Sequence, residues 1–120
     1  MHQNIYAFAK DGKRQVWEIP RLWKLAEGLP QFEWEIQNFA EFDKDVWFCG
    51  VTAPTVRNVF SHCMRINSAD LSYPIMLDHQ GGIIDGVHRI LKAKTIDLKT
   101  VPAVQFISLP EPDRVEDWPQ

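Results

Sequence analysis

Short apolar segments along the chain predict strands separated by helices. In residues 32–36 apolar and charged side chains alternate, which indicates a half-buried strand with Phe32, Trp34 and Ile36 facing inward. The apolar segment 5–9 predicts another strand, because turn-forming residues follow it directly. Three more strands are expected later in the chain, at residues 74–78, 83–84 and 101–107, with a hairpin turn between the first two.

Apolar residues at helical spacing predict three helices. The first covers about residues 20–27, because a proline suits its first position and Gly28 follows its end. The second covers about 56–68, with Thr55 as its N-cap. The third covers about 87–97.

The second helix carries an apolar stripe along one face. Its members are Val56, Val59, Phe60 and Cys63. A stripe of this kind usually faces the interior of a protein, so Cys63 is expected in the core.

Strands and helices in this order predict a mixed α/β fold of the α+β class, with a small mixed sheet packed against about three helices. We expect a single domain over residues 1–108, because splitting 120 residues in two would leave each half short of a core. Residues 109–120 hold three prolines and five charged residues and predict an extended, acidic C-terminal arm that packs through Trp118.

The formal net charge of −3 argues against a bulk electrostatic attraction to nucleic acid. The chain also lacks a helix-turn-helix pattern, so no sequence-specific DNA binding is expected. A local basic cluster can still bind one phosphate-bearing small molecule, and the net charge does not exclude that.

The sequence shows no sign of export or of a membrane span. Its first residues lack a basic segment followed by an apolar one, and the longest apolar run is far below the roughly 18 residues that a spanning helix needs. Cys49 and Cys63 form neither a CxxC pair nor a pattern with zinc spacing. We therefore expect a cytoplasmic protein with reduced thiols and no membrane partner.

The segment that carries candidate chemistry is Asp85-Gly86-Val87-His88-Arg89, between a strand and a helix. Backbone N–H groups at a helix start lack intrahelical acceptors, and the helix dipole adds partial positive charge there. A glycine lets the backbone approach a ligand closely. Basic residues in a first helical turn are unfavourable against the dipole unless an anion lies beside them. The plainer interpretation is that Asp85 caps the helix while His88 and Arg89 are solvated.

Three segments together resemble the ParB/sulfiredoxin superfamily: residues 74–77, residues 82–93 and the Val-Pro-Ala-Val sequence of residues 101–104. In that family an apolar strand, a turn, a Gly-x-x-Arg junction, an Ala-rich helix and a closing strand follow in this order. The resemblance covers about a third of the chain, and it implies the fold of a ParB-like N-terminal domain.

Members of that superfamily bind nucleotide phosphates at this junction. The resemblance implies that Gly86, His88 and Arg89 hold phosphate oxygens of a nucleotide such as ATP, ADP or CTP, and Lys92 shares their helix face. The helix that begins after Thr55 corresponds to a family helix that lines the same pocket. It would contribute Thr55, Arg57 and Asn58 from the opposite wall.

This chain departs from the known junctions. Sulfiredoxin has a cysteine directly before its His-Arg pair, whereas this chain has Val87, so the reductase nucleophile is missing. Chromosome-partitioning ParB proteins have Gly-Glu-Arg-Arg and a helix-turn-helix domain. The junction is most similar to the Asp-Gly-His-His-Arg type of the ADP-dependent free-serine kinases, from which it differs only at Val87.

A phosphotransferase needs a general base and usually Mg²⁺ beside the phosphates. Asp85 adjoins the junction and is the first candidate for both roles, with His88 and His62 as further acid–base candidates. Glu33 and Glu35 share a strand face and offer carboxylates for Mg²⁺. Spacing alone favours a solvated surface for His62 and for the two glutamates.

The sequence thus predicts a small nucleotide-binding protein, with nucleotide-dependent phosphotransfer as its candidate activity. One alternative is a non-catalytic nucleotide-responsive or partner-binding module on the same fold. Another is an ADP-ribosylating toxin that uses NAD. The five tryptophans favour the core over stacking on a ligand, and Trp47, which follows an acidic segment, is the one candidate exception.

Overall fold

The computed structural model describes residues 5–48 and 50–117, and it has the α+β fold that the sequence predicts. In chain order its elements are β1 (Ile5–Lys10), β2 (Lys13–Glu18), α1 (Ile19–Leu25), the 3-10 helix η1 (Ala26–Gly28), β3 (Phe32–Glu35), the 3-10 helix η2 (Ile36–Asn38), α2 (Val56–Ser68), β4 (Ile75–Leu77), β5 (Ile83–Asp85), α3 (Val87–Thr95), β6 (Thr100–Gln105) and β7 (Arg114–Asp117). The strands form one sheet of order β1-β2-β7 and another of order β3-β6-β4-β5. The expected packing of Trp118 and the thiol of Cys49 lie outside the described residues.

The chain divides into two compact units, which are described separately. The first combines residues 1–30, 76–85 and 104–120, and the second combines residues 31–75 and 86–103. Strands β4 and β6 each run from one unit into the other along the chain.

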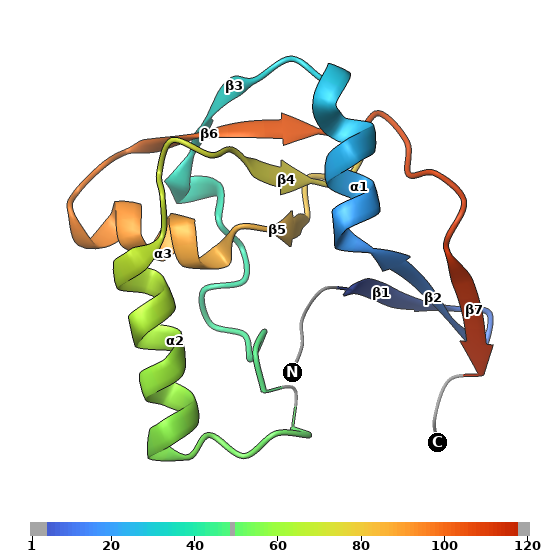
Figure 1. Ribbon diagram of the computed structural model, residues 1–120, viewed down its shortest axis with the longest axis horizontal. Coiled ribbons are helices and arrows are strands. Elements are labelled where there is room, and N and C mark those ends of the chain that lie inside the picture. The colour runs from blue at the N-terminus through green and yellow to red at the C-terminus, as the bar shows by residue number, and fades with distance from the viewer. Residues whose placement is uncertain (1–4, 49, 118–120) are drawn as a thin grey trace. The chain divides into compact units, whose positions relative to one another are not determined.

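In the first unit, β1, β2 and β7 form an antiparallel sheet, and α1 follows β2 directly (Figure 1). Trp17 is buried, stacks on Phe8 at 5.2 Å between ring centroids, and donates from Nε1 to the carbonyl of Pro110 at 2.8 Å. The buried core of this unit consists of Trp17, Ile19, Leu22, Ala26, Met76, Ile84, Val104 and Phe106.

The β4–β5 turn of the first unit is held by the buried carboxylate of Asp78. It accepts hydrogen bonds from the N–H groups of Gln80 and Gly82, both at 2.8 Å, and from the Tyr6 hydroxyl, also at 2.8 Å. A buried carboxylate needs such donors to offset its lost hydration. The turn is therefore fixed to β1 as well as to its own strands.

Strands β2 and β7 were not predicted from the sequence, and β7 lies within the segment expected as an extended arm. It pairs with β2 in antiparallel register, Lys13 opposite Asp117 and Val16 opposite Arg114. Arg114 also pairs with Glu18 across the strands at 2.7 Å. Polar residues dominate β7, so its strand conformation depends on this pairing rather than on an apolar pattern of its own.

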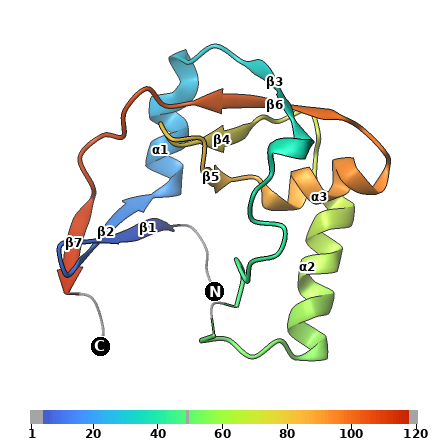
Figure 2. The same ribbon diagram turned by 180° about the vertical axis from the view of Figure 1, so that it is seen from behind.

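In the second unit, β3 pairs with the first residues of β6, with Trp34 opposite Val101. Trp34 and Ile36 are buried as predicted, whereas Phe32 is 40% exposed, so its expected inward orientation is wrong. Helices α2 and α3 lie side by side in both views (Figures 1 and 2).

Helix α2 has the predicted bounds and the predicted cap, since the Thr55 hydroxyl accepts from the Asn58 N–H at 3.1 Å. The expected burial of Cys63 is wrong, because this side chain is exposed together with the rest of the apolar stripe. The half-buried positions are instead Asn58, His62 and Ile66, which are four residues apart and follow a different face of the helix. Specific polar contacts with α3, described below, set this orientation.

Candidate functional site

The β5–α3 junction can only be built with glycine at position 86. Gly86 has φ of +124°, and a Cβ there would lie 2.5 Å from Cγ2 and 2.7 Å from Cβ of Ile75. No side chain caps α3, and its first turn contains no acidic residue. The predicted strand–glycine–helix arrangement is therefore present, and the first N–H groups of α3 have no intrahelical acceptor.

Two histidines from neighbouring helices meet at this junction. Nδ1 of His62 on α2 and Nε2 of His88 on α3 are 2.9 Å apart. The ring centroids are 5.1 Å apart and the ring planes differ by only 14°. At this distance one imidazole nitrogen donates its proton and the other accepts it. We call His62 and His88 the imidazole pair.

The indole of Trp47 lies against the imidazole pair. Its plane is within 11° of the His62 ring and within 8° of the His88 ring, at centroid distances of 4.1 and 5.0 Å. Phe48 meets the His62 ring edge to face at 5.5 Å. Trp47, the candidate exception among the tryptophans, thus stacks on two of the candidate acid–base residues.

The environment of His62 favours its neutral form. Partial burial, and then the positive charge of Arg65, lower the pKa of His62 below its ordinary value of 6.5. A neutral imidazole retains one lone pair, so at pH 7 the pair can accept a proton.

The cations of α3 have different surroundings. Lys92 donates from Nζ to the carbonyls of Asn67 and Ala69, both at 2.9 Å, and so holds the C-terminal end of α2. Arg89 is half-buried. Hydrogen bonds from Ser72, and then the charges of Lys92 and Arg89, hold the pKa of Asp70 below its usual range.

The start of α2, proposed from the sequence as the opposite wall, is occupied by its own capping contacts. The Asn58 side chain donates to the carbonyl of Ala53 at 2.7 Å, while Thr55 accepts from the Asn58 N–H. Thr55 precedes His62 by seven residues, or about 10 Å along a helix. Arg57 is exposed. Among the α2 candidates, His62 is the residue that the structure brings to His88.

The two metal-ligand candidates each have a protein donor. Asp85 accepts from Trp23 Nε1 at 2.8 Å, and Glu33 accepts from the Thr100 hydroxyl at 2.7 Å. Glu35 accepts from Gln37 instead. Across residues 5–48 and 50–117, no three His, Cys, Asp or Glu side chains are grouped so that they could hold a metal ion.

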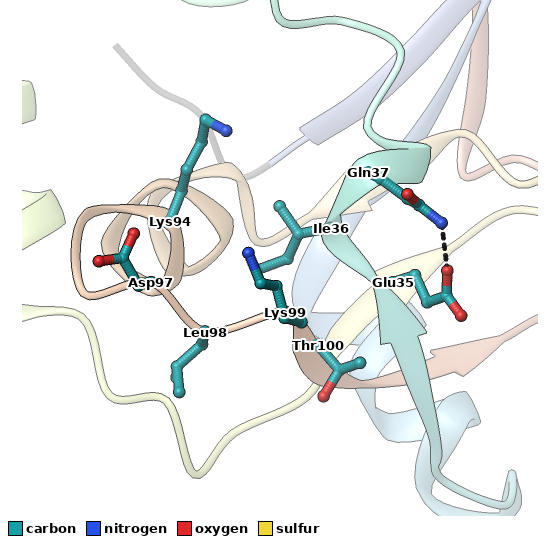
Figure 3. Close-up of a pocket in the computed structure, with 8 residues that line it drawn as sticks. All are labelled: Glu35, Ile36, Gln37, Lys94, Asp97, Leu98, Lys99 and Thr100. Carbon is teal, nitrogen blue, oxygen red and sulfur yellow. Dashed lines mark hydrogen bonds between the residues drawn. The ribbon is translucent and has the colours of Figure 1, made fainter.

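Two of the cavities that described residues line lie in the second unit. One, of about 450 Å³, lies between the loop of residues 39–48 and the Val87 and Leu91 side chains of α3. The other, of about 490 Å³, lies between the end of α3 and β3, where Lys99 and Ile36 occupy the middle of the view in Figure 3. Lysines and acids alternate around this second cavity, so its lining has no single charge preference.

The chain matches no family model, and no curated protein or solved structure is similar to it. A helix able to cross a bilayer would have to be longer and more apolar than any helix among the described residues.

Proposed function

We propose that this protein binds the phosphate groups of a nucleotide at the start of α3. One observation carries the proposal: α3 begins at a glycine with no capping side chain and no acid, yet it has His88 and Arg89 in its first turn. Both residues are unfavourable against the helix dipole, and a phosphate accepting from the same N–H groups would offset that cost.

The imidazole pair supports a phosphotransferase version of this proposal. His88 in the first turn of α3 could take the proton of an attacking hydroxyl, with His62 stabilising the resulting charge through the shared hydrogen bond. Asp85 precedes the same turn and is the second candidate base. Because no described group of three ligands exists, Mg²⁺ would be bound largely through the phosphates, with Asp85 as the nearby carboxylate in sequence.

The test is thermal unfolding with ATP, ADP, CTP, GTP and NAD, each with and without Mg²⁺. A nucleotide at one hundred times its Kd stabilises the folded state by about 2.7 kcal/mol. We expect one nucleotide to raise the Tm of the wild type and to have little effect on Arg89→Gln, which keeps a long side chain but removes the charge. Product analysis of the same samples then separates a phosphotransferase from a non-catalytic binding module.

The matched control is Lys24→Gln, which removes one exposed positive charge from α1. This variant should keep the full nucleotide-dependent shift. A wild type whose Tm is unchanged by every nucleotide would refute phosphate binding at α3. An equal loss in both variants would mean that only net charge is being sensed.

A further inference from the structure

The two rings of the imidazole pair lie edge to edge. Their planes differ by 14°, and Nδ1 of His62 is only 2.9 Å from Nε2 of His88, although the ring centroids are 5.1 Å apart. The rings therefore lie in almost one plane, with the two nitrogens facing each other. The indole of Trp47 is nearly parallel to both rings and covers them on one side. The hydrogen bond that joins α2 to α3 thus depends directly on the protons that the two imidazoles carry.

This hydrogen bond survives one added proton but not two. In the neutral pair one facing nitrogen donates its proton and the other accepts it. A first added proton turns one ring into an imidazolium, which donates more strongly to the ring that stays neutral. After a second added proton both facing nitrogens carry hydrogen, so no acceptor remains between them. Two cationic rings then face each other across 2.9 Å, and repulsion replaces attraction between α2 and α3.

The segments that meet at the imidazole pair carry charged side chains of both signs. They are Arg57 and Arg65 on α2, Asp70 after α2, Arg89, Lys92 and Lys94 on α3, and Glu41, Asp43, Lys44 and Asp45 on the loop before Trp47. Burial, and then the charge of Arg65, lower the pKa of His62 and so oppose its protonation. Hydrogen bonds from Ser72 hold the pKa of Asp70 low, so this carboxylate stays ionised where histidines titrate.

Helix α2 has a shallow attachment to its unit, where it lies beside α3 (Figures 1 and 2). None of its thirteen residues, all of which the structure describes, is fully buried. Lys92 holds its C-terminal end through the carbonyls of Asn67 and Ala69, and the imidazole pair lies more than one turn earlier. A helix of this length is only marginally stable alone in water. Loss of the imidazole pair would therefore leave the N-terminal part of α2 free to unfold.

We infer that the imidazole pair is a pH-sensitive switch, which holds α2 against α3 until both histidines are protonated and then releases the N-terminal part of α2. The C-terminal end stays attached through Lys92, so the opening is local and the rest of the chain remains folded. The switch acts without a nucleotide, and its test therefore does not depend on the proposed phosphate site.

Amide hydrogen exchange of the nucleotide-free protein between pH 7.5 and pH 5 measures the opening, after correction for the intrinsic pH dependence of exchange. We expect the amides of residues 60–65 to lose protection below pH 6.5, by up to about tenfold per pH unit, because the opening takes up one proton. The amides of β2, the central strand of its sheet, are the reference. Protection of α2 that is independent of pH, or that falls equally with that of β2, overturns the inference.

His62→Gln removes the titrating group and keeps a side chain that can donate and accept. Its α2 amides should have the same protection at pH 7.5 and at pH 5. The matched control is His79→Gln, which removes an exposed histidine from the β4–β5 turn and should keep the pH dependence of the wild type. A pH dependence that survives His62→Gln, or one that His79→Gln abolishes, would exclude the imidazole pair as the switch.

Arg65→Gln tests the switch in a chain that keeps both histidines. Loss of this charge raises the pKa of His62 towards its ordinary value, so α2 should open at a higher pH than in the wild type. Arg57→Gln removes an exposed arginine that lies farther from His62 along the same helix, and it should leave the opening pH close to that of the wild type. An equal opening pH in the two variants would show that the proton does not enter at His62.

Discussion

Gly86 shows how far one residue can determine the geometry of the candidate site. Its backbone has φ of +124°, and the space that a Cβ would need is filled by Ile75. The first N–H groups of α3 therefore point where they do because this position has no side chain. The same close approach keeps β4 and the start of α3 in contact within the second unit.

Gly86→Ala should destabilise the protein by about 3 kcal/mol or more, because it adds both backbone strain and a collision with Ile75. Urea unfolding measures the change. Gly12→Ala is the matched control, since Gly12 also has positive φ, +75°, but nothing lies within 4 Å of its Cβ position. The control should cost about 1 kcal/mol. Equal losses would mean that strain alone makes glycine necessary at position 86.

His62 makes stability depend on pH. Its lowered pKa means that the unfolded chain takes up a proton first as the pH falls below 6.5. The stabilisation from neutral His62 is therefore complete above pH 6.5 and is lost as the pH falls through the lower, folded-state pKa. Unfolding free energy measured from pH 8 to pH 5 should decline more steeply for the wild type than for His62→Gln. Parallel profiles would show that His62 is not the group responsible.

At the scale of elements, the local pattern predicted most of the helices and strands. Proline, glycine and threonine marked the helix ends. Helix α2 has the predicted bounds, whereas α1 begins one residue and ends two residues earlier than predicted. Strand β7 was missed because Arg114, Glu116 and Asp117 are stabilised by partners about a hundred residues earlier. The face of α2 was also wrong, because hydrogen bonds through His62 and Lys92 outweigh the pull of an apolar stripe.

Removing residues 113–120 tests the contribution of β7. The truncated chain loses the pairing with β2 and the hydrogen bond from the Glu18 N–H to Asp113. We expect a loss of roughly 2 kcal/mol or more, since each net backbone hydrogen bond contributes about 1 kcal/mol. Lys13→Ala removes only an exposed ion pair with Asp117 and should change the urea midpoint little. An unchanged midpoint after truncation would show that β7 is dispensable.

At the scale of the whole molecule, the sequence predicted where the junction lies but not which residues from other segments contact it. The order Asp85-Gly86-Val87-His88-Arg89 was enough to predict a helix start after a strand, because that is a local property. The pairing of His88 with His62, and the indole of Trp47 on both, joins three separate segments. No spacing rule connects those segments, so spacing alone favoured a solvated His62.

The β2–β7 pairing has a consequence for synthesis of the chain. During translation, residues 13–18 emerge long before residues 114–117, with which they pair. The first unit therefore cannot complete its sheet until residues 114–117 have left the ribosome, whereas all the residues of α2 and α3 are released earlier. Pairing across so long a sequence separation is slow to form. The nascent chain would expose the unpaired edge of β2 throughout that interval, which makes this strand the natural contact for a chaperone.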